Sequence, residues 1–526
     1  MGNVQVLDCT LRDGGYCNQW RFGNNNISKI IDSLIETGID VIECGFLSNK
    51  VKTDSDMSRY ADFEQLRPHI PINHAGKLMV VMANYGECLA ADLPECKDSP
   101  VDGIRVAFHK KDVAEALNLC EDIKSKGYSV FVQAMVSLNY SDREFLDLIS
   151  KVNDLKPYAF YIVDSFGMMK RKDLMRLFYL VENNLKESIK IGFHSHNNLQ
   201  LAYSNAQALV ETQSARDLII DSSIYGMGRG AGNLNTELFI QYLNETIGTS
   251  YYLNPILNLM DEVLEKFYRT SPWGYTLPNY LSAAHNAHPN YAGYLSEKNT
   301  LTVESMNEIF DMMDGDKKSS YDKDYIEELY IRYMETGKAQ EQHRDDLHNA
   351  IGGKTVLVIG PGMSSEDEKT KISDYAKNNS VISIDINFNY PHINTDYTFV
   401  SNIRRFRELD PKIRSKCIIT SNIPADGIYL QTDYRELLND EETVRDNAGL
   451  MLIKFLIAMD VKKIVVAGLD GYSHDILKNY AEEQMIFISK KAFLDATNEG
   501  MSKMLAKFSK MANIEFLTKP RYYKVG

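Results

Sequence analysis

Short apolar runs alternate with amphipathic segments along roughly the first 240 residues of the chain. Apolar runs of this length fit strands that are buried on both faces, and segments such as "ISKIIDSLIETG" between them have helical periodicity. Because eight strand–helix units are typical of a parallel (β/α)8 barrel, we predict a TIM barrel over residues 1–245. The eight predicted strands are residues 4–10, 41–46, 77–83, 103–109, 129–136, 159–165, 189–196 and 217–224.

The pattern changes after the predicted barrel. Residues 246–350 are rich in aromatic side chains and have helical periodicity, so we predict a helical extension that ends in a polar linker. A second alternation of strands and helices begins with "KTVLVIGPGMSS", which combines an apolar strand with a glycine-containing turn. Residues 351–526 are therefore predicted to form a smaller, doubly wound, Rossmann-like domain.

Composition and charge restrict the class of partner. The formal net charge of -14 disfavours nucleic acids and anionic membranes as partners, because both bind basic patches. Seven cysteines without a C-x-x-C pair fit a reducing compartment better than a disulfide framework. The first residues lack the basic and apolar regions of a secretory leader, and no apolar run is long enough to span a membrane, so we expect neither feature. We therefore expect a cytoplasmic protein that acts on small molecules.

The segment "IKIGFHSHNN" places two of the chain's 11 histidines one residue apart at the end of a predicted strand. Side chains two residues apart lie on the same face of a strand, so His194 and His196 are expected to project together. That geometry suits a pair of metal ligands, although hydrogen-bonded core histidines have the same pattern. In a closed barrel the eighth strand lies beside the seventh and the first, so Asp13 and Asn233 are expected at the same rim.

Four motifs occur in order and at barrel spacing: "DCTLRDGG", "VDSFG", "GFHSHNNLQLA" and "YGMGRGAGN". Together they resemble the metal-dependent, hydroxymethylglutaryl-CoA lyase-like superfamily of lyases and aldolases, whose hallmark is an Arg-Asp pair after the first strand. The branch that the motifs resemble best is that of the 4-hydroxy-2-oxovalerate aldolases. Isopropylmalate and homocitrate synthases and hydroxymethylglutaryl-CoA lyases are more distant. The likeness covers residues 1 to about 300.

The resemblance implies a metal site. Asp13, His194 and His196 match the metal ligands of the superfamily, and Asn233 matches a fourth ligand that several members use. Two imidazoles with oxygen ligands suit Mn2+, Mg2+ or Co2+, and the absence of thiolates makes zinc less favoured. The alternative is that four polar side chains simply cap strand ends.

The resemblance also implies roles at the substrate. Arg12 matches the catalytic arginine, which can hold the oxygen that becomes an enolate, or it forms an ion pair with Glu43 at the rim. Glu43 itself would orient Arg12 or a metal-bound water, or serve as a buried structural carboxylate. Ser165 resembles the hydroxyl that contacts the carboxylate of a bound 2-oxo acid, with a turn serine as the alternative.

Two positions depart from the nearest aldolases. Those enzymes place an acid/base histidine three residues beyond the metal-binding aspartate, where this chain has Tyr16. Either Tyr16 or a metal-bound water would then transfer the proton, with His109 as a further candidate. Tyr280 is the best match for a tyrosine placed over the active site, with packing as its alternative role. The loop "YGMGRGAGN" lacks the cysteine of hydroxymethylglutaryl-CoA lyases, and no lysine stands at a strand end for Schiff-base chemistry.

The second domain faintly resembles the Rossmann-like domains of bacterial sialyltransferase-like and flagellin-modifying glycosyltransferase-like proteins. That resemblance implies a nucleotide or nucleotide-sugar ligand near Gly360, Gly362, Asp385 and Asp470. A lone G-x-G turn also occurs for backbone reasons alone, and the third glycine of the dinucleotide fingerprint is replaced by Ser365.

The leading functional hypothesis is a divalent-metal-dependent aldolase or lyase. It would make or break a C–C bond between the enolate of a pyruvate-like 2-oxo acid and an aldehyde, with a sugar of surface-glycan synthesis as a candidate aldehyde. The alternatives are a Claisen-type synthase that uses an acyl-CoA and a 2-oxo acid, and a non-catalytic scaffold that binds nucleotide sugars. Relatives commonly self-associate, so a homo-oligomer is expected.

Overall fold

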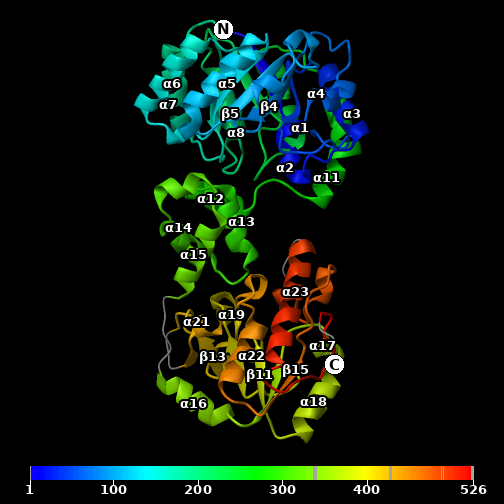
Figure 1. Cartoon of the computed structure of the whole chain (residues 1–526), viewed down its shortest axis with the longest axis vertical. Coiled ribbons are helices and arrows are strands. Elements are labelled where there is room, and N and C mark those ends of the chain that lie inside the picture. Colours follow the sequence, from blue (N-terminus) through cyan, green and yellow to red (C-terminus); the bar gives the residue numbers. More distant parts are fainter. Residues whose placement is uncertain (1, 336–340, 426–428, 487–488, 490, 523–526) are drawn as a thin grey trace. The chain divides into compact units, whose positions relative to one another are not determined.

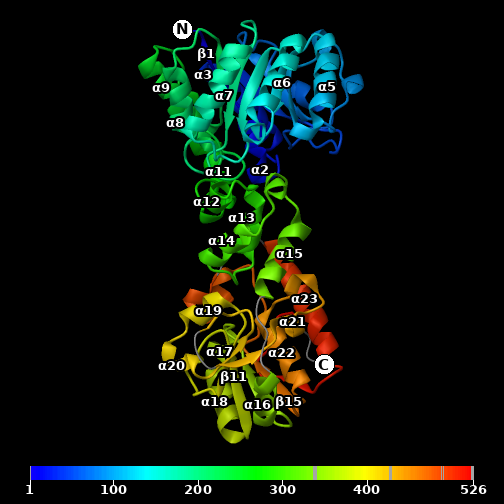
Figure 2. The ribbon, with the colours of Figure 1, turned by 90° about the vertical axis from the view of Figure 1, so that its left-hand side faces the viewer.

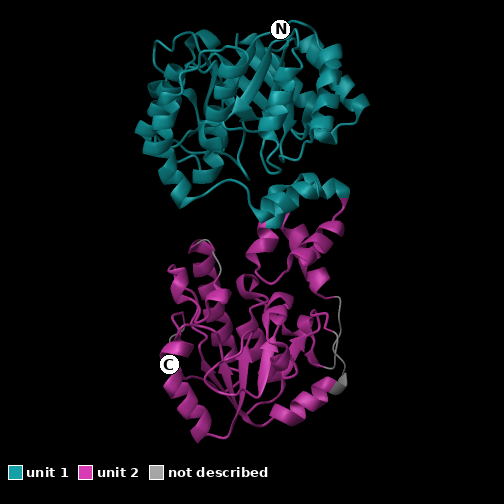
Figure 3. Ribbon diagram, turned by 180° about the vertical axis from the view of Figure 1, so that it is seen from behind, with its two compact units in different colours: residues 1–292, 315–321 teal, residues 293–314, 322–526 magenta. Residues whose placement is uncertain are grey.

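The computed structural model describes the chain except for residues 1, 336–340, 426–428, 487–488, 490 and 523–526. The chain folds into two compact units, which Figure 3 shows in different colours. Unit 1 comprises residues 1–292 and 315–321, and unit 2 comprises residues 293–314 and 322–526.

Unit 1 is a closed parallel barrel, as predicted (Figure 1). Its eight strands pair in the order β1-β9-β8-β7-β6-β5-β4-β2, and pairing between β1 and β2 closes the ring. A two-residue strand, β3 (Arg59–Tyr60), pairs with the end of β2 outside the ring. The barrel strands are β1 (Val4–Asp8), β2 (Val41–Leu47), β4 (Leu78–Asn84), β5 (Gly103–Phe108), β6 (Ser129–Ala134), β7 (Ala159–Asp164), β8 (Lys190–Ser195) and β9 (Leu218–Ser222).

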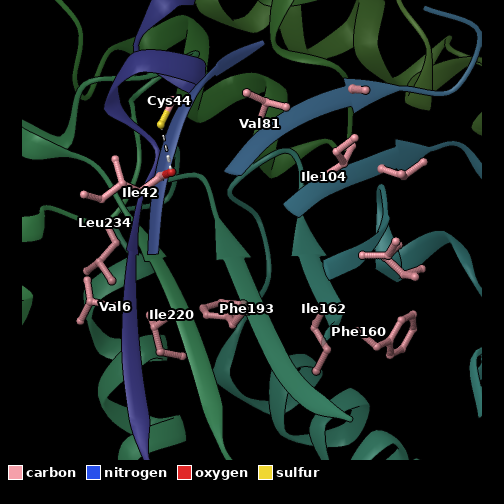
Figure 4. Close-up of a cluster of buried hydrophobic side chains, with 14 of the residues drawn as sticks. Val6, Ile42, Cys44, Val81, Ile104, Phe160, Ile162, Phe193, Ile220 and Leu234 are labelled. Atoms are coloured by element: carbon pink, nitrogen blue, oxygen red, sulfur yellow. Dashed lines mark hydrogen bonds between the residues drawn. The ribbon is translucent and has the colours of Figure 1, made fainter. Parts of the chain in front are cut away.

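Both faces of each barrel strand are buried, which explains why the strands appear as continuous apolar runs. On β8, Ile191 and Phe193 belong to the core layer between the strands and the surrounding helices. Figure 4 shows part of this outer layer on neighbouring strands. A second cluster, which includes Leu7 and Tyr161, comes from the alternate positions and fills the interior. Because side chains alternate, His194 lies on the interior side, toward the carboxyl end of β8.

Amphipathic helices surround the barrel. In α3, apolar side chains at positions 27, 30, 31 and 34 are buried at helical spacing, and Gly38 ends the helix in the left-handed region with φ 92°. Ser141 and Glu144 form a capping box that starts α6. The helices of this part are α1 (Thr10–Asp13), α2 (Gly15–Asn18), α3 (Asn24–Thr37), α4 (Phe63–Leu66), α5 (Val113–Ser125), α6 (Asp142–Leu155), α7 (Arg171–Asn184), α8 (Ala202–Glu211) and α9 (Thr236–Thr246).

The helices of residues 246–350, which the sequence predicts as one extension, are shared between the units because they pack on different cores. Ile256 and Leu259 of α10 join the core of the barrel. Tyr330 of α15 instead donates a hydrogen bond to Asp446 of unit 2, at 2.5 Å. These helices are α10 (Asn254–Leu259), a π-helical turn (Met260–Leu264), α11 (Glu265–Thr270), α12 (Leu277–Ala284), α13 (Pro289–Glu297), α14 (Val303–Asp311), α15 (Lys323–Met334) and α16 (Glu341–Ile351).

Unit 2 contains a seven-stranded parallel sheet of Rossmann-like type, in the order β14-β13-β12-β11-β10-β15-β16 (Figure 2). Helix α18 packs on Leu357 and Ile359 of β10, and α22 lies against β11 and β12. From β10 the sheet grows toward β11 on one side and toward β15 on the other. The carboxyl ends of β10 and β15 therefore border the crevice in which such sheets bind ligands.

The strands of unit 2 are β10 (Thr355–Ile359), β11 (Val381–Ile386), β12 (Tyr397–Val400), β13 (Cys417–Thr420), β14 (Leu430–Thr432), β15 (Lys463–Ala467) and β16 (Ile514–Phe516). Its helices are α17 (Ser364–Asp367), α18 (Lys369–Asn378), α19 (Ile403–Glu408), α20 (Pro411–Arg414), α21 (Tyr434–Leu437), α22 (Ala448–Ala458) and α23 (Lys491–Phe508). In the described part of the chain, no helix has the length and apolar character needed to cross a membrane.

Candidate metal centre and adjoining pocket

Three buried side chains converge at the carboxyl rim of the barrel. Asp13, His194 and His196 each offer a ligand atom, and these atoms lie within 4.8 Å of one another. Asp13 ends the helical turn α1 that follows β1, whereas His194 lies on β8 and His196 just beyond it. Their grouping supplies two imidazoles and a carboxylate, a donor set that suits a divalent cation.

The loop after β9 returns the chain to this cluster. Gly232 has φ 83°, and a Cβ there would lie 1.9 Å from the carbonyl oxygen of Gly226, so the tight turn needs glycine. The turn places Asn233 opposite His196 in a β-bridge. Asn233 donates from Nδ2 to Asp13 Oδ2 at 2.7 Å, and its buried Oδ1 has no hydrogen-bond partner. A free, buried carboxamide oxygen is suited to be a fourth ligand.

The surroundings of the two histidines differ, and each leaves a ring nitrogen without a hydrogen-bond partner. His194 Nδ1 lies 2.9 Å from Asp221 Oδ2, so an ionised Asp221 holds the proton on Nδ1 and leaves Nε2 for a metal. His196 Nδ1 is buried without a hydrogen-bond partner. Burial lowers the pKa of His196 to about 4, against the opposing pull of Asp13, so the imidazole is neutral at neutral pH. Only the neutral imidazole can bind a cation.

A buried ion-pair network surrounds the three side chains. Arg12 joins Nε to Glu43 Oε2 at 2.8 Å and Nη1 to Asp13 Oδ1 at 2.5 Å. Arg105 forms ion pairs with Glu43, at 2.8 Å, and with Asp221. The network thus combines three carboxylates with two guanidinium groups and carries one net negative charge when the histidines are neutral. Burying a net charge is costly, and a bound cation would offset it.

Two pKa shifts follow from this network. Burial opposes ionisation of Asp13, but Arg12 and the two histidines outweigh it and hold the pKa of Asp13 well below its usual value. Burial also opposes ionisation of Asp221, and Arg105 together with His194 lowers the pKa of Asp221 nevertheless. Both carboxylates are therefore ionised at neutral pH. The Nη2 atom of Arg12 remains buried without a hydrogen-bond partner beside them.

Three other residues that the sequence predicts in the site, Ser165, Tyr16 and Tyr280, differ in their surroundings. Ser165 follows β7, and its Oγ accepts a hydrogen bond from the amide of Val136 at 2.9 Å. Tyr16 lies on α2 and is 44% exposed, and desolvation raises its pKa despite the nearby Arg229. Tyr280 lies on α12, is 42% exposed and is not among the residues that line the pocket beside Tyr16.

A pocket of about 610 Å3 adjoins the candidate metal centre. A Cβ on Gly228 would lie 2.2 Å from Asn233 Nδ2 and 2.7 Å from Asp13 Oδ2, so the pocket wall directly contacts the cluster. The pocket is lined by Tyr16, Gly228, Arg229, Trp273, His288 and Tyr321, among others.

Sequence reasoning did not select Arg105, Asp221, Arg229 or His288. Arg105 gives a usable signal, because it is a charged residue inside an otherwise apolar strand and must find buried partners. Arg229 stands in the glycine-rich loop of a quoted motif, which is a weaker indication. His288 comes from the helical region, where the sequence pattern contains nothing that ties it to the barrel rim.

Unit 2 contains a separate cavity of about 190 Å3 at the ends of β10 and β15. Gly362 and Asp470 line it, and a Cβ on Gly362 would lie 2.6 Å from Asp470 Cγ. Gly360 stands at the end of β10, where a Cβ would lie 2.5 Å from the oxygen of Gly468. Asp385 is fully buried and does not line the cavity; its carboxylate accepts hydrogen bonds from the Tyr390 amide and the Thr395 hydroxyl.

Fold and site together define unit 1 as a (β/α)8 barrel with a candidate metal centre at its carboxyl rim. Residues 104–262 match the model of the HMGL-like family, and this match confirms the resemblance of the motifs to that family. The likeness of residues 351–526 to glycosyltransferases stays a prediction.

Individual relatives agree with this assignment. A 4-hydroxy-2-oxovalerate aldolase from Geobacillus genomosp. 3 is 26% identical over 268 residues, which cover 50% of this chain and 77% of the relative. An oxaloacetate decarboxylase from Mycobacterium tuberculosis is 25% identical over 244 residues, 45% of this chain and 69% of the relative. The crystal structure of the N-terminal domain of a Bacteroides vulgatus protein, provisionally named an aldolase, has 28% identity and a TM-score of 0.50. That similarity covers 58% of this chain and 99% of the crystallised domain.

Proposed function

We propose that the protein is a divalent-metal-dependent aldolase or lyase. It would join the enolate of a pyruvate-like 2-oxo acid to an aldehyde, or cleave the resulting C–C bond. The observation that carries the proposal is the buried cluster of Asp13, His194 and His196, in which His196 Nδ1 has no hydrogen-bond partner and which belongs to an ion-pair network with one excess negative charge. The names of the aldolase relatives support the same chemistry.

The site residues have separable tasks in this proposal. Asp13, His194, His196 and Asn233 would hold the ion. A bound divalent ion would supply Lewis-acid stabilisation of the negative charge that develops on the 2-oxo acid. The free Nη2 of Arg12 would donate to the same developing oxyanion, and its bonds to neighbouring carboxylates fix the guanidinium beforehand.

Two hydroxyl groups would act on the substrates. Ser165 accepts a hydrogen bond from the Val136 amide, which leaves its own proton free to donate to the substrate carboxylate. Tyr16, whose pKa is raised by desolvation, stays protonated at neutral pH. In the addition direction it would protonate the alkoxide formed from the aldehyde, and the resulting phenolate would regain a proton from solvent; cleavage would run through the reverse of these two steps.

The test combines metal analysis with proton exchange at C3 of pyruvate, followed by NMR in deuterated water. We expect wild-type protein with Mn2+ to exchange, and a variant that combines Asp13→Ala with His194→Ala to lose bound metal and exchange together. The matched control is Asp122→Ala, which removes an exposed carboxylate from α5. Wild-type protein that binds no divalent ion and exchanges no proton would contradict the proposal. Release of free thiol from an acyl-CoA would instead establish the Claisen-type alternative.

We further propose that unit 2 binds a nucleotide or nucleotide sugar, and that the aldehyde is a sugar of surface-glycan synthesis. The cavity at the strand ends, with Gly362 and Asp470 in its wall, supports a ligand there. Its volume of about 190 Å3 is below the ~300–1,000 Å3 of typical ligand pockets, so it suits one moiety such as a sugar or a base. Calorimetric titration of the full chain with UDP, GDP and CMP tests this; no heat with any of them would exclude nucleotide binding.

A further inference from the structure

The pocket beside the candidate metal centre has room for a second substrate. Gly228 and Arg229 form its wall toward the cluster, and the Arg229 amide lies 3.4 Å from Asp13 Oδ2. The opposite wall comes from Trp273, His288 and Tyr321 of the helical region of unit 1. The pocket therefore borders the candidate metal centre at Gly228 and Arg229, and an aldehyde must bind close to the enolate in order to react.

Arg229 differs from the two other arginines near this rim. Arg12 and Arg105 are each paired with two carboxylates. The guanidinium of Arg229 is half-buried, and within the described residues no carboxylate comes within 4.0 Å of it. It lies over the ring of Tyr16, with Cζ 5.6 Å from the ring centroid. A half-buried cation without a carboxylate partner among the described residues is one that a ligand anion would stabilise strongly.

His288 holds this guanidinium in place. Arg229 Nη2 donates to His288 Nε2 in a short contact. The ring of His288 packs edge-on against Phe166, with centroids 5.6 Å apart, and stacks with Tyr321 at 5.8 Å. Burial, reinforced by Arg229, lowers the pKa of His288 to about 3, so the imidazole is neutral and its Nε2 can accept a hydrogen bond from the guanidinium. The remaining N–H groups of Arg229 are left for a ligand.

We propose that Arg229 binds an anionic group, a carboxylate or a phosphate, on the aldehyde partner. This inference rests on the proposed aldolase function and names the class of its second substrate as anionic aldehydes. A guanidinium matches the paired oxygens of either anion and forms charge-assisted hydrogen bonds with them. The carboxylate of the 2-oxo acid already has Ser165 as a candidate donor, so Arg229 is assigned to the other substrate.

The decisive experiment compares aldehydes that differ in charge. The pairs are butyraldehyde with succinic semialdehyde, and glyceraldehyde with glyceraldehyde 3-phosphate, each added to pyruvate and Mn2+. We expect wild-type protein to favour the charged member of one pair, about tenfold to 100-fold in kcat/KM, as hydrogen bonds to charged groups allow. The pair that shows the preference identifies carboxylate or phosphate as the anion. Equal kcat/KM within both pairs would overturn the inference.

Variants separate recognition of the aldehyde from formation of the enolate. In Arg229→Met the KM of the charged aldehyde should rise about tenfold to 100-fold, and Arg229→Lys should recover part of the loss. The matched control is Arg171→Met, an exposed arginine of α7 paired with Glu211. A rise in the KM of pyruvate for C3 exchange in Arg229→Met would assign the arginine to the 2-oxo acid and overturn the inference.

Binding without turnover distinguishes this inference from the proposed function. Succinate, glycerol 3-phosphate and glycerol serve as unreactive probes in calorimetric titrations of the Mn2+-loaded wild type and Arg229→Met. Binding of an anionic probe that is lost in the variant supports the inference even if no pyruvate exchange occurs. If an anionic probe binds but pyruvate shows no C3 exchange, the aldolase proposal is contradicted and the anion site is not. Failure of both anionic probes to bind the wild type would overturn the anion site.

Discussion

Both compact units place a cavity at the carboxyl ends of parallel strands, yet the groups around the two cavities differ in kind. In unit 1, buried polar atoms of the candidate metal centre beside the pocket lack hydrogen-bond partners, among them Arg12 Nη2, His196 Nδ1 and Asn233 Oδ1. In unit 2 the charged groups of the lining are already satisfied. Asp470 accepts hydrogen bonds from the amide and hydroxyl of Ser364, and Arg405 donates to main-chain oxygens of the same unit.

The difference shows what fold and side chains each determine. The parallel strands fix where a ligand binds, because their carboxyl ends and the following loops leave a crevice in both units. Whether the polar groups around a cavity already have hydrogen-bond partners indicates whether the site favours catalysis or binding. Unpartnered, charged groups that converge on one point favour catalysis in unit 1, whereas satisfied groups around a small cavity favour binding in unit 2.

Among the variants that test this comparison, Arg12→Lys is expected to have the largest effect. Lysine keeps the charge, but its compact ammonium cannot reproduce the planar fork that bonds to Glu43 and Asp13 through two nitrogens and presents a third nitrogen as a free donor. We expect C3 exchange of pyruvate to fall about 100-fold to 1,000-fold, the loss typical of one oxyanion donor, with bound metal retained. Exchange rates and metal content are measured together, with the exposed Arg21→Lys as control. Full exchange in Arg12→Lys would remove Arg12 from the reaction.

The second prediction tests whether the buried carboxylate of Asp385 has a structural role in unit 2. Burial raises the pKa of Asp385 from 3.8 to about 6, although the Tyr390 amide and the Thr395 hydroxyl donate hydrogen bonds to it. The folded state then binds more protons than the unfolded state between those values, so stability falls as pH rises from about 4 to 6. The shift corresponds to up to about 3 kcal/mol.

Asp385→Asn should remove that loss, because the amide does not titrate. The free energy of unfolding of unit 2, followed by urea denaturation at several pH values, should therefore depend less on pH between 4 and 6. The same slope in wild type and variant would show that Asp385 does not titrate there. A loss of nucleotide binding in the variant would instead place Asp385 in the ligand site.

The third prediction concerns the support of the candidate metal centre. Asp221→Asn keeps the shape of the side chain but removes the charge that orients His194. We expect Mn2+ affinity to fall about tenfold to 100-fold, as for other groups that orient metal ligands. Competition with a chromogenic chelator measures the affinity, and Asp217→Asn, at the partly exposed start of the same strand, is the matched control. Equal Mn2+ affinities of Asp221→Asn and Asp217→Asn would show that His194 does not need Asp221 in order to bind the metal.

The sequence predicted the barrel and the residues of its rim better than it predicted their partners. Eight apolar runs and the spacing of His194 and His196 suffice for the fold and the ligand pair, because period-two alternation and barrel closure decide both. The Arg105–Asp221 pair joins residues 116 positions apart, which no local pattern reveals. Asp385 shows the same limit, since the end of a strand does not tell whether a carboxylate faces a cavity or the core.

The smallest expected effect separates the two units directly. A Cβ on Gly362 would lie 2.6 Å from Asp470 Cγ and 2.6 Å from the oxygen of Gly468, so Gly362→Ala must displace part of the cavity wall. We expect nucleotide affinity to fall about tenfold, the effect of about 1.4 kcal/mol of steric strain. Gly293→Ala is the matched control, because a Cβ there meets no atom within 4 Å. If Gly362→Ala also lowered C3 exchange of pyruvate in the barrel, the two sites would be coupled. If it changed neither nucleotide affinity nor exchange, the cavity of unit 2 would not be a nucleotide site.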